Sequence, residues 1–297
     1  MANPAGSSAM RAIPLGLSSE ELRALVEAAL KEDLGSGDLT TRLTVAPGRR
    51  ARGALLSQQE LTVAGLPVAA EVFRALDAEI CFEANVEDGA EVDAGAQLAL
   101  VTGTAATLLT GERVALNFLQ HLSGIATLTR RLQTRLTGLK TELLDTRKTT
   151  PGLRALEKYA VRAGGGKNHR LRLDDGILIK NNHLRLAGGI RAAVENARKL
   201  RPTEVTNLAI EVEVASLAEL DEAIAAGAEA VLLDNMTPAL VRECVARAAG
   251  RIRLEVSGGV NTSNIRAYAE AGVDAISVGA LTHSAPAANI HFLIEPL

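Results

Sequence analysis

Aromatic side chains are scarce in this sequence. Tryptophan is absent, and Phe, Trp and Tyr together make up 2% of the 297 residues. Aliphatic side chains must therefore fill the core, since 47% of the residues are still hydrophobic. A chain of this length and apolar content can bury a large core, either as one big α/β domain or as two domains.

Cysteine is nearly absent as well, because Cys81 and Cys244 are the only two. Two cysteines so far apart in the sequence argue against a disulfide framework and against a cysteine-based metal knuckle. We expect both to be buried thiols in a protein of a reducing compartment.

The chain also lacks a large net charge and a long apolar run near its start. The formal net charge is -3 at pH 7, which argues against a general nucleic-acid binder, whose domain would be strongly basic. Residues 1–17 contain two prolines and two glycines, with no apolar run long enough for a signal sequence or a membrane span. We expect a flexible leader at 1–17 and a cytoplasmic protein without nucleic-acid or membrane partners.

Positive charge is concentrated in one stretch, residues 145–183. This stretch holds nine Lys or Arg against four Asp or Glu, a surplus of five, so the rest of a chain with net charge -3 carries -8. A solvated basic face is the ordinary explanation of a charge run. Here the cations lie beside three glycines, 164–166, and after apolar runs, where ligand sites are more common than on exposed helix surfaces. We therefore favour a binding site.

The same stretch has the pattern of a strand, a helix and a second strand. Apolar runs at 143–144 and 177–179 each end in basic residues, with a helical pattern between them. In folds with parallel strands, groups at the carboxyl ends of the strands face the ligand. We expect the following side chains to converge on one polyanion: Arg147, Lys148, His169, Arg170 and Lys180.

The fold class predicted by the whole pattern is α/β, with a small N-terminal α/β sandwich and an open, incomplete (β/α) barrel of about six to seven parallel strands. Apolar runs alternate with helical segments after residue 141, which predicts parallel strands joined by right-handed crossovers. Six runs are too few for a closed eight-stranded barrel. Helices at 107–121 and 123–136 would link the two parts. The expected domains are 18–122 for the sandwich with its linking helix, 123–280 for the barrel, and 281–297 for a segment that packs back on the first domain.

Acidic and glycine-rich segments follow the later strands. Glu211 and Glu213 alternate, so they point to the same side of a strand, and Asp234 ends the next strand. Buried carboxylates need cations or a metal. For Glu211, an ion pair with a Lys or Arg of the barrel is an equally good interpretation. Turns at Ser257, Gly258, Gly259 and at Gly279, Ala280 could each open a helix and bind a phosphate.

Several of these motifs together carry a family resemblance. DTRKTTPGLR at 145–154 is followed by AVRAGGGKNHRLRLDDGILIKNNH at 160–183, and then come EVEV, LLDN, SGGV and VGALTHS. In this order and spacing the sequence resembles the quinolinate phosphoribosyltransferase family, the carboxylating nicotinate-nucleotide pyrophosphorylases, from about Leu22 to the end. Lys167 departs from the family pattern, which has an uncharged or aromatic residue there. This difference concerns loop packing more than chemistry.

The resemblance implies phosphoribosyl transfer from phosphoribosyl pyrophosphate to quinolinate with loss of CO2, assisted by Mg²⁺. It implies a homodimer, or a higher even oligomer, in which Arg113 reaches the neighbouring active site. Lys148, Glu213 and Asp234 would be catalytic, with Glu213 and Asp234 near the metal. The implied quinolinate site is Arg113, Thr146, Arg147, His169, Arg170 and Lys180. The implied phosphoribosyl site is Lys148, Glu213, Asp234, Ser257, Gly258, Gly259, Gly279 and Ala280.

Two other functions fit parts of the pattern. A Schiff-base aldolase would use a lysine at the end of a barrel strand, such as Lys180. A molybdenum-transport-associated paralogue of the same family, without catalytic activity, would be expected to lack some of the paired cations or carboxylates. Every position that can be matched is present in this sequence.

Overall fold

The computed structural model describes residues 16–297. Most of the predicted leader, 1–15, lies outside the described residues. Within the described part of the chain, no helix combines the length and the apolar content needed to cross a membrane.

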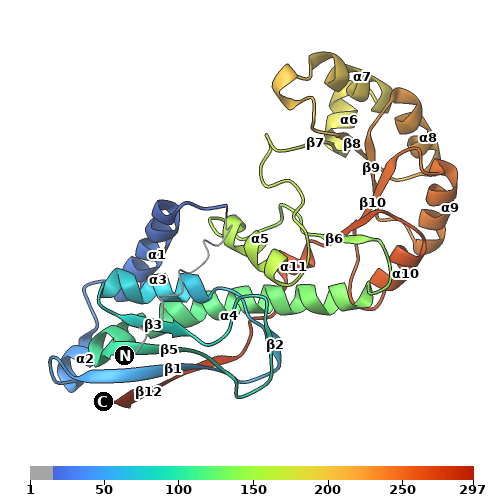
Figure 1. Cartoon of the computed structure of the whole chain (residues 1–297). Helices are drawn as coiled ribbons and strands as arrows, with labels where there is room; N and C mark the ends of the chain where they lie inside the picture. The colour runs from blue at the N-terminus through green and yellow to red at the C-terminus, as the bar shows by residue number, and fades with distance from the viewer. Residues whose placement is uncertain (1–15) are drawn as a thin grey trace, which may run out of the picture.

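The N-terminal part is an antiparallel sheet covered by helices on one face (Figure 1). Its strands lie in the order β12-β1-β5-β3, and burial along β1 alternates, because successive side chains point to opposite faces and one face packs on the helices. The strands are β1 (Arg50–Ser57), β3 (Cys81–Ala84), β5 (Gln97–Thr104) and β12 (Ile290–Pro296), with a separate pair β2 (Leu61–Thr62) and β4 (Glu91–Val92). The helices are α1 (Ser19–Leu34), α2 (Leu39–Thr44) and α3 (Leu66–Leu76).

The prediction that both cysteines are buried is wrong for Cys81. Cys244 is buried in the core, but Cys81 is exposed. Cys81 begins β3, which lies at the edge of the antiparallel sheet and has little cover along its length.

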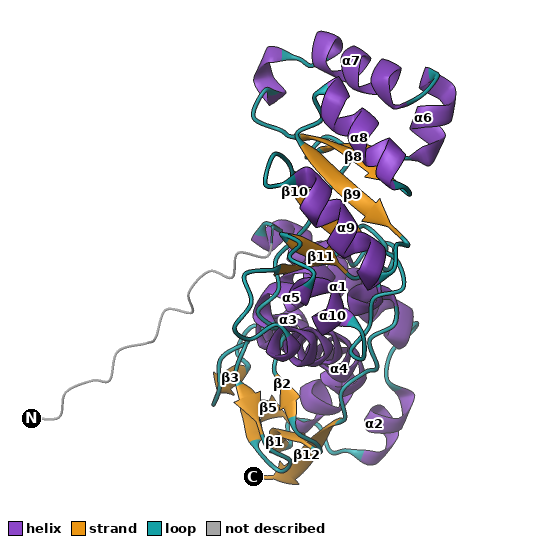
Figure 2. Cartoon of the chain, turned by 90° about the vertical axis from the view of Figure 1, so that its right-hand side faces the viewer, coloured by secondary structure: helices purple, strands orange, loops and turns teal. Residues whose placement is uncertain are grey.

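The two linking helices predicted at 107–121 and 123–136 are a single helix, α4 (Ala105–Arg135). Ser123 and Gly124 do not break it, because both are held by tertiary contacts. The Ser123 hydroxyl contacts the backbone N–H and C=O of Ala64, and a side chain at Gly124 would lie 2.2 Å from the backbone oxygen of Pro286. Figure 2 shows α4 between the antiparallel sheet and the C-terminal part.

The C-terminal part is a six-stranded parallel sheet with helices outside it, as predicted. Its order is β6-β11-β10-β9-β8-β7, so β6 and β7 are its two edges and the barrel is open. The strands are β6 (Glu142–Leu144), β7 (Ile177–Ile179), β8 (Ile210–Val214), β9 (Ala230–Asp234), β10 (Arg253–Ser257) and β11 (Ala275–Ser277). The helices are α5 (Arg154–Ala163), α6 (Asn181–Ala187), α7 (Ile190–Leu200), the 3-10 turn η1 (Thr203–Val205), α8 (Leu217–Ala226), α9 (Pro238–Ala248), α10 (Ile265–Glu270) and α11 (Ala280–His283).

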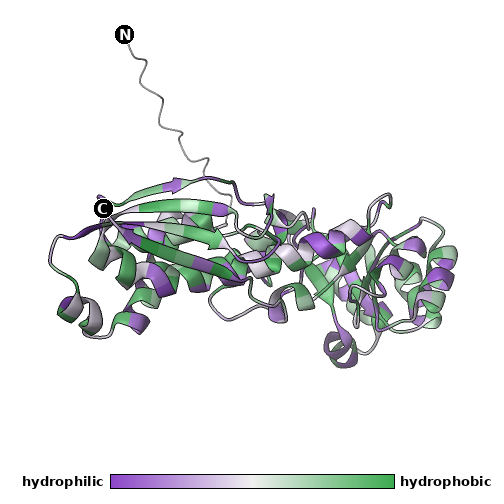
Figure 3. Cartoon of the chain, turned by 90° about the horizontal axis from the view of Figure 1, so that it is seen from below, coloured by the Kyte–Doolittle hydropathy of each residue, from purple (hydrophilic) through white to green (hydrophobic). Residues whose placement is uncertain are grey.

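The last strand of the chain, β12, belongs to the N-terminal sheet. β12 returns to the N-terminal sheet and pairs with β1 from Ala51 opposite Pro296 to Ser57 opposite Ile290. Figure 3 shows hydrophobic and hydrophilic residues alternating along the helices of the C-terminal part, as is typical of helices with one buried face. The inner face and the carboxyl ends of the parallel strands are left for polar groups.

Candidate active site

Strand register places a row of acidic side chains on one face of the parallel sheet. Glu213 pairs with Leu232, and Leu232 pairs with Glu255, so all three point to the same side. Asp234 pairs in turn with Ser257, two residues further along the same strands. Glu213, Asp234 and Ser257 therefore share the face that Glu211 also lines.

His169 lies against two of these carboxylates. Its Nε2 is 3.3 Å from Glu211 Oε2 and 3.6 Å from Glu255 Oε2, and the side chains of both glutamates are nearly buried. Burial alone would lower the pKa of His169, but the two carboxylates outweigh burial and raise it. Burial, and then the charge of Glu211, raise the pKa of Glu255 to about 7. The partner of Glu211 is thus a histidine rather than a Lys or Arg.

The other ring nitrogen of His169 argues against a metal at this cluster. His169, Glu211 and Glu255 place their ligand atoms within 4.8 Å of one another. A histidine that binds a metal through one nitrogen normally donates an N–H from the other. Here Nδ1 accepts a hydrogen bond from the backbone N–H of Arg170 at 2.8 Å, so the remaining proton sits on Nε2 and faces the carboxylates.

The predicted cations do come together near this face. The Arg147 Nε is buried and has no hydrogen-bond partner among residues 16–297. Arg170 donates from Nη1 to the Gly176 carbonyl at 2.8 Å, and its pKa is lowered by burial and then by the charge of Arg147. The two arginines repel each other, and the Arg147 Nε–H lacks an acceptor within the described part of the chain. A bound anion would offset the repulsion and could accept hydrogen bonds from both side chains.

Lys180 and Glu213 form an ion pair that the sequence pattern did not indicate. Lys180 Nζ lies 3.2 Å from Glu213 Oε2 at the ends of β7 and β8. Burial, and then the charge of Glu213, raise the pKa of Asp234, while Lys180 and Lys148 lower it. The two carboxylates therefore face each other with lysines beside them.

The glycine turns at the ends of β10 and β11 lie at the same edge of the sheet. Gly258 has a φ of +95°, and a side chain there would lie 2.3 Å from Asn235 Oδ1, so only glycine fits. A side chain at Gly279 would lie 3.1 Å from Lys148 Cδ. The turns at Gly279 and Ala280 and at Ser257 to Gly259 thus lie beside Lys148 and Asp234.

One expectation about these turns is wrong. Ala280 does open a helix, α11, but Ser257 to Gly259 do not, because α10 begins only at Ile265. Gly258 and Gly259 both have positive φ and instead turn the chain over the end of β10.

His283 contacts Ser284 Oγ through Nδ1 at 2.6 Å, in keeping with a role in loop hydrogen bonding. Lys167 forms an exposed ion pair with Glu142.

Thr146 and Arg113 differ in how the chain places them. Thr146 lies beside the cations, where its hydroxyl accepts a hydrogen bond from the backbone N–H of Lys148 at 3.1 Å. Arg113 is exposed on α4. It lies eight residues, or about 12 Å along the helix axis, before His121, which contacts Glu157 of α5. Among residues 16–297, the Arg113 side chain has no hydrogen bond or ion pair.

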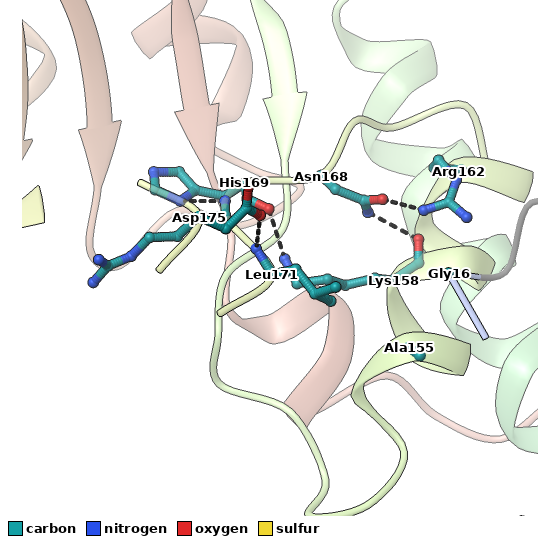
Figure 4. Close-up of a pocket in the computed structure, with 9 residues that line it drawn as sticks. Gly16, Ala155, Lys158, Arg162, Asn168, His169, Leu171 and Asp175 are labelled. Atoms are coloured by element: carbon teal, nitrogen blue, oxygen red, sulfur yellow. Dashed lines mark hydrogen bonds between the residues drawn. The ribbon is translucent and has the colours of Figure 1, made fainter. Parts of the chain in front are cut away.

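A buried network that the sequence did not predict lies behind His169. Lys158 on α5 donates to Asp145, the residue after β6, and the two side chains are 1% and 0% exposed. Asn168 donates to Asp145. It also donates to the Lys158 carbonyl and accepts from Arg162 (Figure 4). Burial raises the pKa of Asp145 and lowers that of Lys158, and their mutual attraction opposes both shifts.

This network borders a cavity of about 340 Å³ lined by Lys158, Arg162, His169 and Arg170, among others. The one indication of the network in the sequence is that Lys158 lies at an apolar position of the helix, beside Leu156 and Tyr159. Glu255 was missed too, although it lies in a strand with the same alternation as Glu211 and Glu213.

Comparison with known proteins gives the site a family. Residues 38–123 match the model of the quinolinate phosphoribosyl transferase N-terminal domain, and residues 125–292 match that of its C-terminal domain. A probable nicotinate-nucleotide pyrophosphorylase [carboxylating] of Synechocystis is 44% identical over 254 residues, 84% of this chain and 85% of that protein. Its counterpart in Bacillus subtilis is 42% identical over 270 residues, 91% of this chain and 92% of that protein.

Solved structures agree with the sequence relatives. NadC from Streptococcus pyogenes has a TM-score of 0.89 and 39% identity, covering 95% of this chain and 99% of that one. The nicotinate-nucleotide pyrophosphorylase of Francisella tularensis has a TM-score of 0.87 and 40% identity, covering 94% and 98%. Both domains, their order and their geometry match, and the chain belongs to the quinolinate phosphoribosyltransferase family.

Proposed function

We propose that this chain catalyses transfer of the phosphoribosyl group of phosphoribosyl pyrophosphate to quinolinate, with loss of CO2, giving nicotinate mononucleotide and pyrophosphate. The observation that carries the proposal is that two sets of side chains meet at one edge of the parallel sheet, in a chain of this family. One set is cationic and includes Arg147, whose Nε has no hydrogen-bond partner among residues 16–297. The other set consists of two carboxylates, Glu213 and Asp234, and the neighbouring glycine turns.

Quinolinate carries two carboxylates, and the cationic set suits them. Arginine forks bind planar carboxylates through paired N–H donors. Arg147 and Arg170 would supply the forks, with Thr146 and Lys180 beside them. His169 has both ring nitrogens engaged within the chain, so it would act by holding Arg170 unless it turns on binding.

Phosphoribosyl pyrophosphate suits the other set. The turns at Ser257 to Gly259 and at Gly279 and Ala280 expose backbone N–H groups to a phosphate. Lys148 lies against Gly279 and near Asp234, where it can neutralise the departing pyrophosphate. Glu213 and Asp234 would face the ribose.

A magnesium ion fits the carboxylate pair. Glu213 and Asp234 offer hard oxygen donors, and burial, followed by the charge of Glu213, raises the pKa of Asp234. Mg²⁺ typically takes one or two carboxylates together with substrate phosphates and water. When bound there, the ion would neutralise the charge of the pyrophosphate group. Glu213 would then have to share its charge between the ion and Lys180.

The reaction requires four bond changes. The bond from ribose C1 to pyrophosphate breaks first, leaving an oxocarbenium-like ribose that the carboxylates of Glu213 and Asp234 stabilise. The pyridine nitrogen of quinolinate then bonds to C1. Finally the bond from ring C2 to its carboxylate breaks, CO2 leaves, and C2, whose electron pair is stabilised by the adjacent cationic nitrogen, takes up a proton. The chain contributes position and charge, with no covalent intermediate.

A shared active site completes the proposal. Arg113 is exposed on α4 and its side chain has no hydrogen bond or ion pair among residues 16–297, which favours a homodimer, or a higher even oligomer, in which it reaches a neighbouring site. A cytoplasmic location, expected from the sequence, stays a prediction.

The test is an assay of the full-length protein with quinolinate, phosphoribosyl pyrophosphate and Mg²⁺. We expect nicotinate mononucleotide, pyrophosphate and CO2 in equal amounts, and loss of activity on addition of a chelator. Absence of the mononucleotide would overturn the proposal. Covalent trapping of Lys180 by a carbonyl compound and borohydride would favour an aldolase instead, although the ion pair of Lys180 with Glu213 argues against it.

A further inference from the structure

The buried Asp145 and Lys158 hold both ends of one residue, His169. Asp145 Oδ1 accepts a hydrogen bond from the His169 backbone N–H at 2.9 Å. Lys158 Nζ donates to the His169 carbonyl at 3.0 Å as well as to Asp145. One ion pair thus fixes the backbone on both sides of the His169 side chain.

The same pair fixes the loop before and after His169. Asn168 donates to Asp145 Oδ2 at 2.6 Å and to the Lys158 carbonyl at 2.9 Å. On the other side, the Arg170 N–H reaches His169 Nδ1. The position of Arg170, one of the two arginines of the cationic set, therefore depends on a peptide that the ion pair holds.

A gain in folding stability does not explain why Asp145 and Lys158 form a buried ion pair. A buried ion pair loses so much hydration that apolar residues of similar volume often stabilise a protein equally well or better. An apolar pair would, however, leave the N–H and C=O of His169 without these partners. The pair instead satisfies both groups and connects the ends of two segments, 145–148 and 167–170, each of which carries site cations.

We propose that Asp145 and Lys158 are positioning residues that hold the His169 peptide and so direct Arg170 toward quinolinate. The inference rests on the proposed function, because it names the substrate whose binding the pair controls. It assigns no contact with substrate to either residue. Apart from Lys148, the phosphoribosyl half of the site is built on β8 to β11, whereas the side-chain hydrogen bonds of the pair go to Asn168 and His169.

The variants follow from the energetics of burial. Lys158→Met alone would leave the Asp145 charge unpaired in the interior and endanger folding. The main variant is therefore Asp145→Asn combined with Lys158→Met, which removes both charges. Asn168→Ala keeps the ion pair and loosens only the loop, so it serves where the double variant fails to fold. Lys167→Met is the matched control, because Lys167 lies in the same loop but forms only an exposed ion pair with Glu142.

Two measurements decide the outcome. In the double variant we expect the KM for quinolinate to rise on the order of 10- to 100-fold, with less than a threefold change for phosphoribosyl pyrophosphate, because small displacements of a binding group are costly. Amide hydrogen exchange at 168–171 should be faster than in the wild type. Asn168→Ala should shift both quantities in the same direction by a smaller amount, and Lys167→Met should shift neither.

A quinolinate KM within twofold of the wild type in the folded double variant, or in Asn168→Ala where the double variant does not fold, would overturn the proposal. Equal increases for both substrates would also overturn it, since a general structural role predicts them. If the wild type makes no nicotinate mononucleotide, the proposed function fails by itself. Hydrogen exchange at 168–171 then still reports whether the pair holds the loop, and unchanged exchange would reject that part independently.

Discussion

Lys180 Nζ lies 3.2 Å from Glu213 Oε2, so one ion pair joins a residue expected to bind quinolinate to a residue expected to face the ribose. Glu213 is also the charge that raises the pKa of Asp234. A change at Lys180 should therefore affect both halves of the site.

We expect Lys180→Met to raise the KM for both substrates. Because Lys180 is half exposed, loss of its ion pair with Glu213 costs about 1 kcal/mol, which corresponds to a severalfold rise in each KM. Steady-state kinetics with each substrate varied in turn will measure the effect. Lys199→Met, at an exposed position of α7, is the control and should change neither constant. A rise confined to quinolinate would show that the ion pair does not connect the two halves.

Arg170 should discriminate quinolinate from nicotinate, which has one carboxylate fewer. Nicotinate leaves part of the cationic set uncompensated and should be a very poor substrate of the wild type. Arg170→Gln should lower kcat/KM for quinolinate much more than kcat/KM for nicotinate. The ratio of the two values should fall at least tenfold. Arg172→Gln, an exposed neighbour, should leave the ratio unchanged. An unaltered ratio in Arg170→Gln would mean that Arg170 does not bind the second carboxylate.

A shared active site predicts complementation between inactive subunits. Arg113→Ala and Arg147→Ala should each be inactive alone, because each removes one arginine from every site. After mixing under conditions of subunit exchange, hybrid dimers contain one site with both arginines, so activity should return toward a quarter of the wild-type value. Native mass spectrometry can verify exchange. Exchange without recovered activity would place Arg113 in its own subunit's site or outside both sites.

Gly258 should tolerate no side chain. Gly258→Ala adds a clash with Asn235 Oδ1 to the strain of a positive φ, whereas Gly188→Ala at a φ of +90° meets only open space. We expect Gly188→Ala to lower the free energy of unfolding by about 1 kcal/mol and Gly258→Ala by about 2 to 4 kcal/mol. Gly258→Ala should also weaken phosphoribosyl pyrophosphate binding. Urea denaturation and substrate titration measure the two effects, and equal losses of stability would contradict the clash.

Glu255 should make the fold less stable as the pH rises. Its pKa is raised from 4.5 to about 7 in the folded protein, so it adds stability below its unfolded pKa and that stability is lost between about pH 4.5 and 7. The raised pKa of His169 acts with the same sign. A shift from 4.5 to 7 corresponds to at most about 3 kcal/mol.

The melting temperature of the wild type should therefore fall between pH 5.5 and 8.5, by several degrees for a chain of this size. Glu255→Gln, which cannot ionise, should flatten this dependence and melt above the wild type at pH 8.5. If both proteins show the same pH profile, the carboxyl of Glu255 is not held in its protonated form.

The sequence by itself predicted the parts of this protein that follow from local pattern. The alternation of apolar runs with helical segments after residue 141 predicted a parallel sheet, and β6 to β11 form one. Strand alternation placed Glu211 and Glu213 on one face. Because parallel strands end at one edge of a sheet, cations that follow separate strands could be expected to meet there.

The family followed from the motifs at 145–154 and 160–183, which fold as a continuous unit around α5. Sequence was sufficient here because the relevant residues lie within forty positions of one another. The comparison with known proteins confirmed the family over both domains.

Tertiary structure alone decided which partners these side chains have. Glu255 joins Glu211 and His169 because the register of β8, β9 and β10 brings residues far apart in sequence to one face. Lys158 can be buried because Asp145 and the His169 carbonyl surround its ammonium group, and α4 continues through Ser123 and Gly124 because Ala64 and Pro286 pack there. Local propensity contains no information on such contacts, since they depend on pairing between distant segments and on burial that exists only in the folded chain.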